Sequence, residues 1–140
     1  MKILLAADGS SFTKKALAFL VIHPELAGPG DELLVVHVQP RVSGGVKSMV
    51  GSAAVNDYHR DEAQKVLAPI DRFLKRHDLR FHTTWSIGVP AAEIVKAAAR
   101  YKVHMIVMGT RGHGVLRRAI MGSVAQSVVA DCDVPVLLVK

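Results

Sequence analysis

The stretch "VHMIVMGTRGHGVLRRAIMGS", residues 103–123, joins an apolar run to a segment rich in glycine and arginine. Its first seven residues, which end at Gly109, are apolar and partly β-branched and predict a buried strand. The segment that follows has glycines at 112, 114 and 122, and no acidic residue lies between 109 and 122. A polar, glycine-rich segment directly after a buried strand is typical of an anion-binding site in α/β proteins.

The rest of the chain alternates between strand-like and helix-like segments. Apolar runs predict further strands at 2–7, 32–39, 80–87 and 134–140, and helical periodicity predicts helices at 12–23, 57–78 and 88–101. With one more helix before the last strand, this order predicts a doubly wound, Rossmann-like α/β domain over residues 1–140. Its five-stranded parallel sheet has helices on both faces. Residues 41–56 are rich in Gly and Ser and lack a period, so we expect a long mobile loop there.

Two polar segments follow strands of this predicted sheet. They are Asp8-Gly9-Ser10-Ser11 after the first strand and the glycine-rich segment after the fourth. Taken singly, Asp8-Gly9 is a turn signal, and Ser123 with Gln126 is a capping-box pattern that predicts a helix start at Gly122-Ser123. Ligands of such sheets bind at the carboxyl ends of the strands, where the strand order reverses, so we expect both segments at one site.

Three common phosphate-binding patterns do not fit. A P-loop requires Lys after its last glycine, but Val115 follows Gly114, and the dinucleotide pattern G-x-G-x-x-G has Arg117 in place of its third glycine. The pyrophosphatase loop SGGxDS is echoed by "SGGVKS" at 43–48, but Lys47 replaces its aspartate. The pattern G-x-x-G, nine residues, G-[ST] does fit, at Gly109, Gly112 and Gly122-Ser123.

With this pattern the chain resembles the ATP-binding branch of the universal stress protein family. The resemblance extends from "ILLAADGSSFTKKAL" (3–17) through "GVPAAEIVKAA" (88–98) to "DVPVLLV" (133–139). It implies a five-stranded parallel sheet, an ATP site over the first and fourth strands, and homodimers that pair through the C-terminal strand. By resemblance, Asp8 holds the ribose or adenine end and Val38 lines the adenine slot. The remaining nucleotide contacts implied are Met108, Gly109, Gly112, Gly122, Ser123 and Val124.

The residue chemistry is consistent with a phosphate ligand. Gly109 and Gly112 lack a Cβ, so their backbone can approach an anion closely and adopt positive φ. Arg111, together with Arg117 and Arg118, adds positive charge, while His113 is expected to be exposed to solvent. We therefore include Arg111 among the predicted site residues.

Composition narrows the classes of partner. The net charge of +6 arises in the second half, because residues 71–140 hold 11 Lys and Arg against 5 Asp and Glu, while residues 1–70 hold 7 of each. Aromatic residues are only 5% of the chain, which argues against nucleic acid as a partner. The single cysteine and the absence of a membrane-length apolar run or signal sequence predict a cytoplasmic protein. The spacing of the seven histidines predicts no metal cage.

These observations predict a small ATP-binding regulatory protein of the stress response, in which the nucleotide serves as a ligand or switch. Mg²⁺ is an optional companion of the triphosphate. The pattern contains no dedicated catalytic base, so we expect slow hydrolysis at most. The alternative is a nucleotide-free, dimeric protein-interaction module on the same fold, with protein partners that the sequence does not identify. An adenylate-chemistry enzyme is a weaker third reading, because the SGGxDS pattern is broken.

Overall fold

The computed structural model describes residues 1–113 and 121–140, so Arg117 and Arg118 lie outside the described residues. The strands are β1 (Lys2–Ala6), β2 (Glu32–Gln39), β3 (Arg80–Ile87), β4 (Met105–Gly109) and β5 (Val136–Val139). The helices are α1 (Ser11–Ile22), α2 (Gly44–Val50), α3 (Ser52–Leu74), α4 (Pro90–Arg100) and α5 (Ser123–Asp131). Four predicted strand–helix units are therefore confirmed, with boundaries that shift by a few residues.

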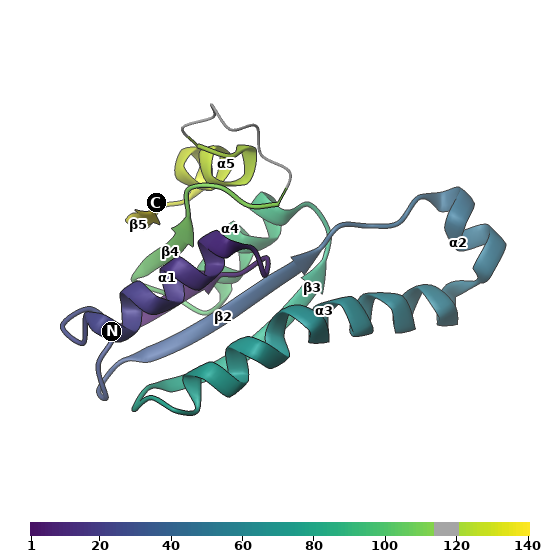
Figure 1. Cartoon of the computed structure of the whole chain (residues 1–140). Helices are drawn as coiled ribbons and strands as arrows, with labels where there is room; N and C mark the ends of the chain where they lie inside the picture. Colours follow the sequence, from purple (N-terminus) through teal and green to yellow (C-terminus); the bar gives the residue numbers. More distant parts are fainter. Residues whose placement is uncertain (114–120) are drawn as a thin grey trace.

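The strands form one parallel sheet with the order β3-β2-β1-β4-β5 (Figure 1). Ile3 of β1 pairs with Leu33 of β2 on one side and with Met105 of β4 on the other. The order of the strands reverses between β1 and β4, because the chain first builds outward to β3 and then returns to add β4 and β5. This reversal places the carboxyl ends of β1 and β4 side by side, as the sequence predicts.

Each face of the sheet is covered by two helices, and successive strand residues alternate between the two faces. On one face, Leu5 and Val35 pack with buried residues of α1 and α3, including Leu20 and Leu67. On the other face, Leu4, Val36 and Ile106 pack with Ile94 of α4 and Val128 of α5. The central strands are buried on both faces, which explains why their sequences are nearly continuous apolar runs.

The expectation of a long loop at 41–56 is wrong, because α2 and the start of α3 occupy most of this segment. The Ser43 hydroxyl accepts a hydrogen bond from the Val46 amide at 3.2 Å and caps α2, while Gly51, with φ of 85°, separates the two helices. α2 buries none of its residues, so it has no need of the apolar stripe that marks a core helix. The absence of a period therefore did not mean the absence of a helix.

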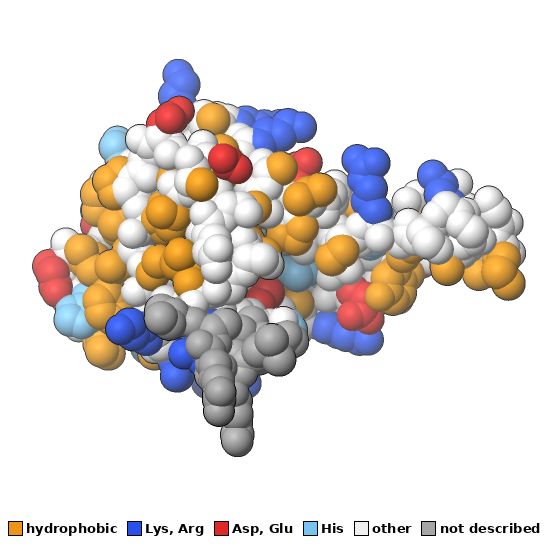
Figure 2. Space-filling model, turned by 90° about the horizontal axis from the view of Figure 1, so that it is seen from above, with side chains coloured by type: hydrophobic (Ala, Val, Ile, Leu, Met, Phe, Trp, Pro, Cys, Tyr) orange, Lys and Arg blue, Asp and Glu red, His pale blue; other side chains and the backbone are white. Residues whose placement is uncertain are grey.

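The α2 segment extends beyond the sheet, and hydrophobic side chains gather at its end (Figures 1 and 2). Met49 is 86% exposed, and Val46 and Val50 on the same side of the helix are about half exposed. Within the described part of the chain, no helix combines the length and the apolar character that crossing a membrane requires.

Candidate functional site

A cleft of about 460 Å³ opens at the carboxyl ends of β1, β2 and β4. It is bordered by α3 on one side and by α4 and the start of α5 on the other. The structure brings all nine predicted site residues to this cleft. They are Asp8, Val38, Met108, Gly109, Arg111, Gly112, Gly122, Ser123 and Val124.

Asp8 lies in a tight turn between β1 and α1. Gly9 has φ of 79°, a conformation that glycine adopts without strain, and this confirms the predicted turn. The carboxylate oxygen Oδ1 accepts hydrogen bonds from the Ser10 amide at 2.9 Å and the Thr13 hydroxyl at 2.8 Å. The Thr13 hydroxyl in turn accepts one from the Asp8 amide at 3.0 Å. These contacts fix the orientation of the carboxylate at the mouth of the cleft.

The environment of Asp8 keeps its carboxylate ionised. Burial by itself would raise its pKa, but hydrogen bonds from Ser10 and Thr13 and the nearby His113 outweigh that effect. The pKa of Asp8 therefore lies below its ordinary value of 3.8. At neutral pH this side chain is a charged hydrogen-bond acceptor, which suits a ligand hydroxyl or amine.

The glycine-rich segment folds back onto Asp8. The His113 amide donates to Asp8 Oδ2 at 3.3 Å, and the His113 ring nitrogen Nε2 lies 2.9 Å from the Asp8 carbonyl oxygen. His113 is exposed, as expected, but its ring also joins the end of β1 to the end of β4. Sequence reasoning missed this contact, because it spans 105 residues of chain.

Close packing explains both glycines of the G-x-x-G element. A Cβ on Gly109 would lie 2.4 Å from the Cβ of Phe12, and a Cβ on Gly112 would lie 2.2 Å from Asp8 Oδ2. Neither glycine has a positive φ, so that part of the prediction is wrong. Close packing against α1, rather than unusual backbone torsion, requires glycine at 109, whereas a side chain at 112 would displace the Asp8 carboxylate.

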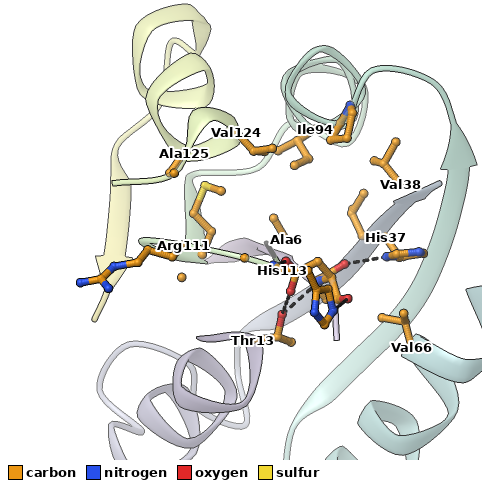
Figure 3. Close-up of a pocket in the computed structure, with 18 of the residues that line it drawn as sticks. Ala6, Thr13, His37, Val38, Val66, Ile94, Arg111, His113, Val124 and Ala125 are labelled. Atoms are coloured by element: carbon orange, nitrogen blue, oxygen red, sulfur yellow. Dashed lines mark hydrogen bonds between the residues drawn. The ribbon is translucent and has the colours of Figure 1, made fainter. Parts of the chain in front are cut away.

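Arg111 borders the cleft, but its guanidinium points away from the other labelled residues (Figure 3). The guanidinium carbon lies 5.6 Å from the centre of the Phe12 ring, and the Lys15 ammonium lies 5.2 Å from the same ring. Both distances are typical of cation–π contacts. The charge of Arg111 is thus close to the cleft, but its guanidinium lies against Phe12, and its Nε is buried without a hydrogen-bond partner in the described residues.

The helix α5 begins at Ser123, as predicted, with Gly122 as its N-cap residue. The predicted capping box is wrong, because no side chain in the described part of the chain caps this helix. The Gln126 amide group donates instead to the Met121 carbonyl at 3.0 Å. Gly122 donates its own amide to the Thr110 carbonyl at 2.7 Å, which holds the helix start against β4. The first-turn amides of α5 therefore border the cleft without a side-chain cap.

Apolar side chains form one wall of the cleft (Figure 3). Val38 comes from β2, Ile94 from α4 and Val124 from α5, and in the figure they lie along one side, opposite Thr13, His113 and Val66. Met108 of β4 adds to the lining and is 6% exposed. A flat aromatic group fits such a wall, and the polar groups at the rim provide orientation.

Several polar residues at the cleft were missed by the sequence analysis, and three of them lie on β2 and α3. His37 and Gln39 of β2 are 5% and 9% exposed, and Glu62 comes from α3. The first two had a signal, since polar residues alternating with Val38 at the end of a buried strand share one face of the sheet. Glu62 had none, because its place at the cleft depends on how α3 packs over β2.

Metal ligands are sparse in the parts of the chain that the structure covers. Residues 1–113 and 121–140 contain no cluster of three or more His, Cys, Asp or Glu side chains suited to a metal ion. Two carboxylates, Asp8 and Glu62, do line the cleft. The site therefore combines two carboxylate side chains, an apolar wall and a helix N-terminus that no described side chain caps.

A family model described as "Universal stress protein family" matches residues 1–140. A universal stress protein from Thermus aquaticus is 37% identical over 140 residues, which cover 99% of this chain and 97% of that protein. The solved structure of protein MJ0577, a universal stress protein of Methanocaldococcus jannaschii, superposes with a TM-score of 0.85. It is 27% identical in sequence and covers 99% of this chain and 94% of its own.

A universal stress protein from Archaeoglobus fulgidus, solved in complex with dAMP, is a more distant neighbour. Its TM-score is 0.72 at 23% identity, with 100% of this chain and 98% of that chain covered. It shows that the same fold occurs in a protein whose structure is a complex with dAMP.

Proposed function

The chain belongs to the universal stress protein family, and we propose that its cleft binds ATP or a related adenine nucleotide as a regulatory ligand. The observation that carries this proposal is the N-terminus of α5, which no side chain of residues 1–113 and 121–140 caps and which borders the same cleft as Asp8 and an apolar wall. Backbone amides and the helix dipole favour an anion at such a position. An adenine nucleotide offers matching groups at each end of the cleft.

Different residues of the cleft are suited to different parts of the nucleotide. The Gly122-Ser123 start of α5 is suited to the phosphates, and the ionised Asp8 is suited to accept hydrogen bonds from ribose hydroxyls. Val38, Met108 and Val124 provide an apolar surface for the base. The dAMP-bound Archaeoglobus fulgidus protein supports a nucleotide ligand on this fold, although its identity to this chain is too low to transfer individual contacts.

Mg²⁺ could enter only as a partner of the phosphates in this proposal. Mg²⁺ keeps several waters and binds through phosphate oxygens and one or two carboxylates, so it does not require a dedicated cage. Asp8 is already held by Ser10, Thr13 and His113. We therefore expect nucleotide binding to depend weakly on Mg²⁺ and hydrolysis to be slow.

The test begins with protein stripped of any copurified nucleotide. Mass spectrometry identifies what the purified protein releases, and calorimetric titration of the stripped protein measures ATP, AMP and adenosine. We expect saturable binding of ATP with one site per chain. Absence of binding by the stripped, folded protein would reject the proposal.

That outcome would favour a protein-interaction module, for which the exposed face of α2 is the specific observation. Val46, Met49 and Val50 lie at helical spacing and are exposed together.

We also propose that the chain forms homodimers through β5. This strand lies at one edge of the sheet, and its residues Val136–Val139 are apolar and only half-buried. An unpaired apolar edge favours pairing with a second strand. Light scattering at micromolar protein should give the mass of two chains, and a Leu138→Lys variant should shift the mass toward one chain. A monomer mass for the parent protein would contradict this proposal.

A further inference from the structure

The side of the cleft opposite α4 contains a pair of polar side chains that the nucleotide pattern does not include. His37 and Gln39 lie two residues apart on β2, on the face that also carries Leu33 and Val35, and both are more than nine-tenths buried. Both residues line the cleft. Their hydrogen bonds determine which chemical group they present to a ligand.

The tautomer of His37 follows from its neighbour. His37 Nδ1 lies 2.8 Å from the backbone carbonyl oxygen of Ala7, and a carbonyl oxygen can only accept. Nδ1 must therefore hold a proton and donate it (Figure 3). In the neutral ring, the second nitrogen, Nε2, is then an acceptor.

The tautomer of His37 orients the side-chain amide of Gln39. Gln39 Nε2 lies 2.7 Å from His37 Nε2, so the amide nitrogen donates to the ring nitrogen. The opposite amide orientation would place two acceptors against each other. Gln39 Oε1 is consequently turned away from His37.

The amide oxygen is available to a ligand. Within residues 1–113 and 121–140, Gln39 Oε1 makes no hydrogen bond. It is also not one of the fully buried polar atoms that lack a hydrogen-bond partner in these residues. Gln39 lines the cleft and is 9% exposed, so a ligand in the cleft can reach this residue. Glu62 of α3, which also lines the cleft, adds further acceptor oxygens.

We propose that Gln39 is a specificity-determining residue whose oxygen accepts a hydrogen bond from the exocyclic amine of the purine base, and that His37 is the residue that positions it. This inference rests on the proposed nucleotide function and adds a residue that recognises the exocyclic amine of the base. It predicts preference for a 6-aminopurine over a purine that lacks the amine. A neutral hydrogen bond of this kind changes affinity by about 2- to 10-fold.

The experiment measures the affinities of two ligands for the parent protein and for variants at two positions. Calorimetric titration of stripped protein gives each affinity. The ligands are ATP and purine riboside triphosphate, which has hydrogen in place of the 6-amino group. The parent should bind ATP about 2- to 10-fold more tightly. In Gln39→Met, which keeps the side-chain length but removes the acceptor, the two ligands should bind equally. Gln64→Met on the exposed face of α3 is the matched control and should keep the preference of the parent.

His37→Phe tests the positioning role separately. It keeps a ring of similar size but removes the nitrogen that holds the Gln39 amide, so the preference for ATP should fall while purine riboside triphosphate still binds. Loss of affinity for both ligands in equal proportion would indicate a merely structural role for His37. Thermal unfolding of each variant verifies that it is folded.

The outcomes separate the two proposals. If the parent does not bind ATP, the nucleotide function and this inference both fail. If the parent binds both ligands equally, the nucleotide function stands and the inference is overturned. If Gln39→Met keeps the preference of the parent, another group reads the amine, and the role assigned to Gln39 is wrong.

Discussion

Among the helices that begin at the cleft, α1 and α5 have N-termini that are built differently. At α1, Ser10 Oγ accepts from the Thr13 amide at 3.5 Å, and the neighbouring Asp8 carboxylate accepts from the Ser10 amide. At α5, Gly122 occupies the cap position and no described side chain satisfies the first turn. The two helix starts thus differ in which groups accept hydrogen bonds from their first-turn amides. α1 uses its own turn, whereas α5 leaves this task to water or to a ligand.

The comparison teaches that the helix start without a cap is the better candidate for phosphate. A serine or aspartate at the cap position of α5 would occupy the amides and repel or exclude an anion. Glycine leaves them accessible, and the dipole of the nine-residue helix adds to their positive potential. Variants that alter one helix start at a time test this division.

The largest effect is expected for Gly122→Val. Gly122 has φ of −73° and ψ of 162°, a conformation open to valine, so the fold should survive. The new side chain would stand in front of the α5 amides, and ATP affinity should fall by roughly 100-fold or more, about 2.7 kcal/mol. Calorimetric titration measures the loss, and circular dichroism monitors folding.

Gly44→Val is the matched control for this variant. Gly44 also begins a helix, and a Cβ there meets no atom within 4 Å. It should bind ATP like the parent. Equal, parent-like affinity in both variants would remove α5 from the phosphate site.

Asp8→Ala should weaken ATP and adenosine by the same factor. The carboxylate is expected to contact the nucleoside and not the phosphates, so both ligands lose one charge-assisted hydrogen bond, worth about 1.5–3 kcal/mol. Titration of the variant with both ligands gives the two factors. A loss confined to ATP would move Asp8 from the nucleoside end to the phosphate end.

Gly109→Ala should lower the free energy of unfolding more than it weakens nucleotide binding. Its Cβ would meet the Cβ of Phe12 at 2.4 Å and backbone atoms at 3.2 Å, none of which moves easily. Overpacking of this kind costs about 1–3 kcal/mol of the free energy of unfolding. Urea unfolding of parent and variant measures the cost. Parent-like stability would show that the contact between β4 and α1 relaxes at little cost.

The pH dependence of stability should separate Asp8 from the other carboxylates. Its folded-state pKa is lowered, so its contribution is complete above its ordinary value of 3.8 and is lost as pH falls through the folded-state pKa. The difference in unfolding free energy between parent and Asp8→Ala should be constant near neutral pH and shrink in this acidic range. A difference that grew on acidification would contradict the direction of the pKa shift.

The smallest effect is expected for Arg111→Ala. Its guanidinium lies against Phe12 outside the cleft. Its positive charge therefore attracts the phosphates only from a distance, without a direct hydrogen bond. ATP should weaken by about 2- to 3-fold, adenosine should not change, and added salt should abolish the difference. A loss of 10-fold or more would mean that Arg111 turns inward and donates to phosphate. The triple change of Arg111, Arg117 and Arg118 to Ala then tests the whole cluster.

Much of the site was predictable because local chemistry and chain order determine it. Buried strands that alternate with helices predict a parallel sheet, and the order reversal predicts that the ends of β1 and β4 meet. The sequence alone therefore predicts that Asp8, Gly109 and Gly122 lie at one cleft. The helix α2 could not be predicted in the same way, because it buries no residue and shows no apolar period.

The sequence by itself determined the order of the elements, the parallel sheet and the group of glycines that borders the cleft, since these depend on periodicity and spacing along the chain. Only the tertiary structure decided why Gly109 and Gly112 are glycine, where Arg111 points, and that Glu62 reaches the cleft. Each of these depends on atoms contributed by elements far apart in the chain. Contacts of that kind are set by how helices pack over a twisted sheet, and a one-dimensional pattern does not encode them locally.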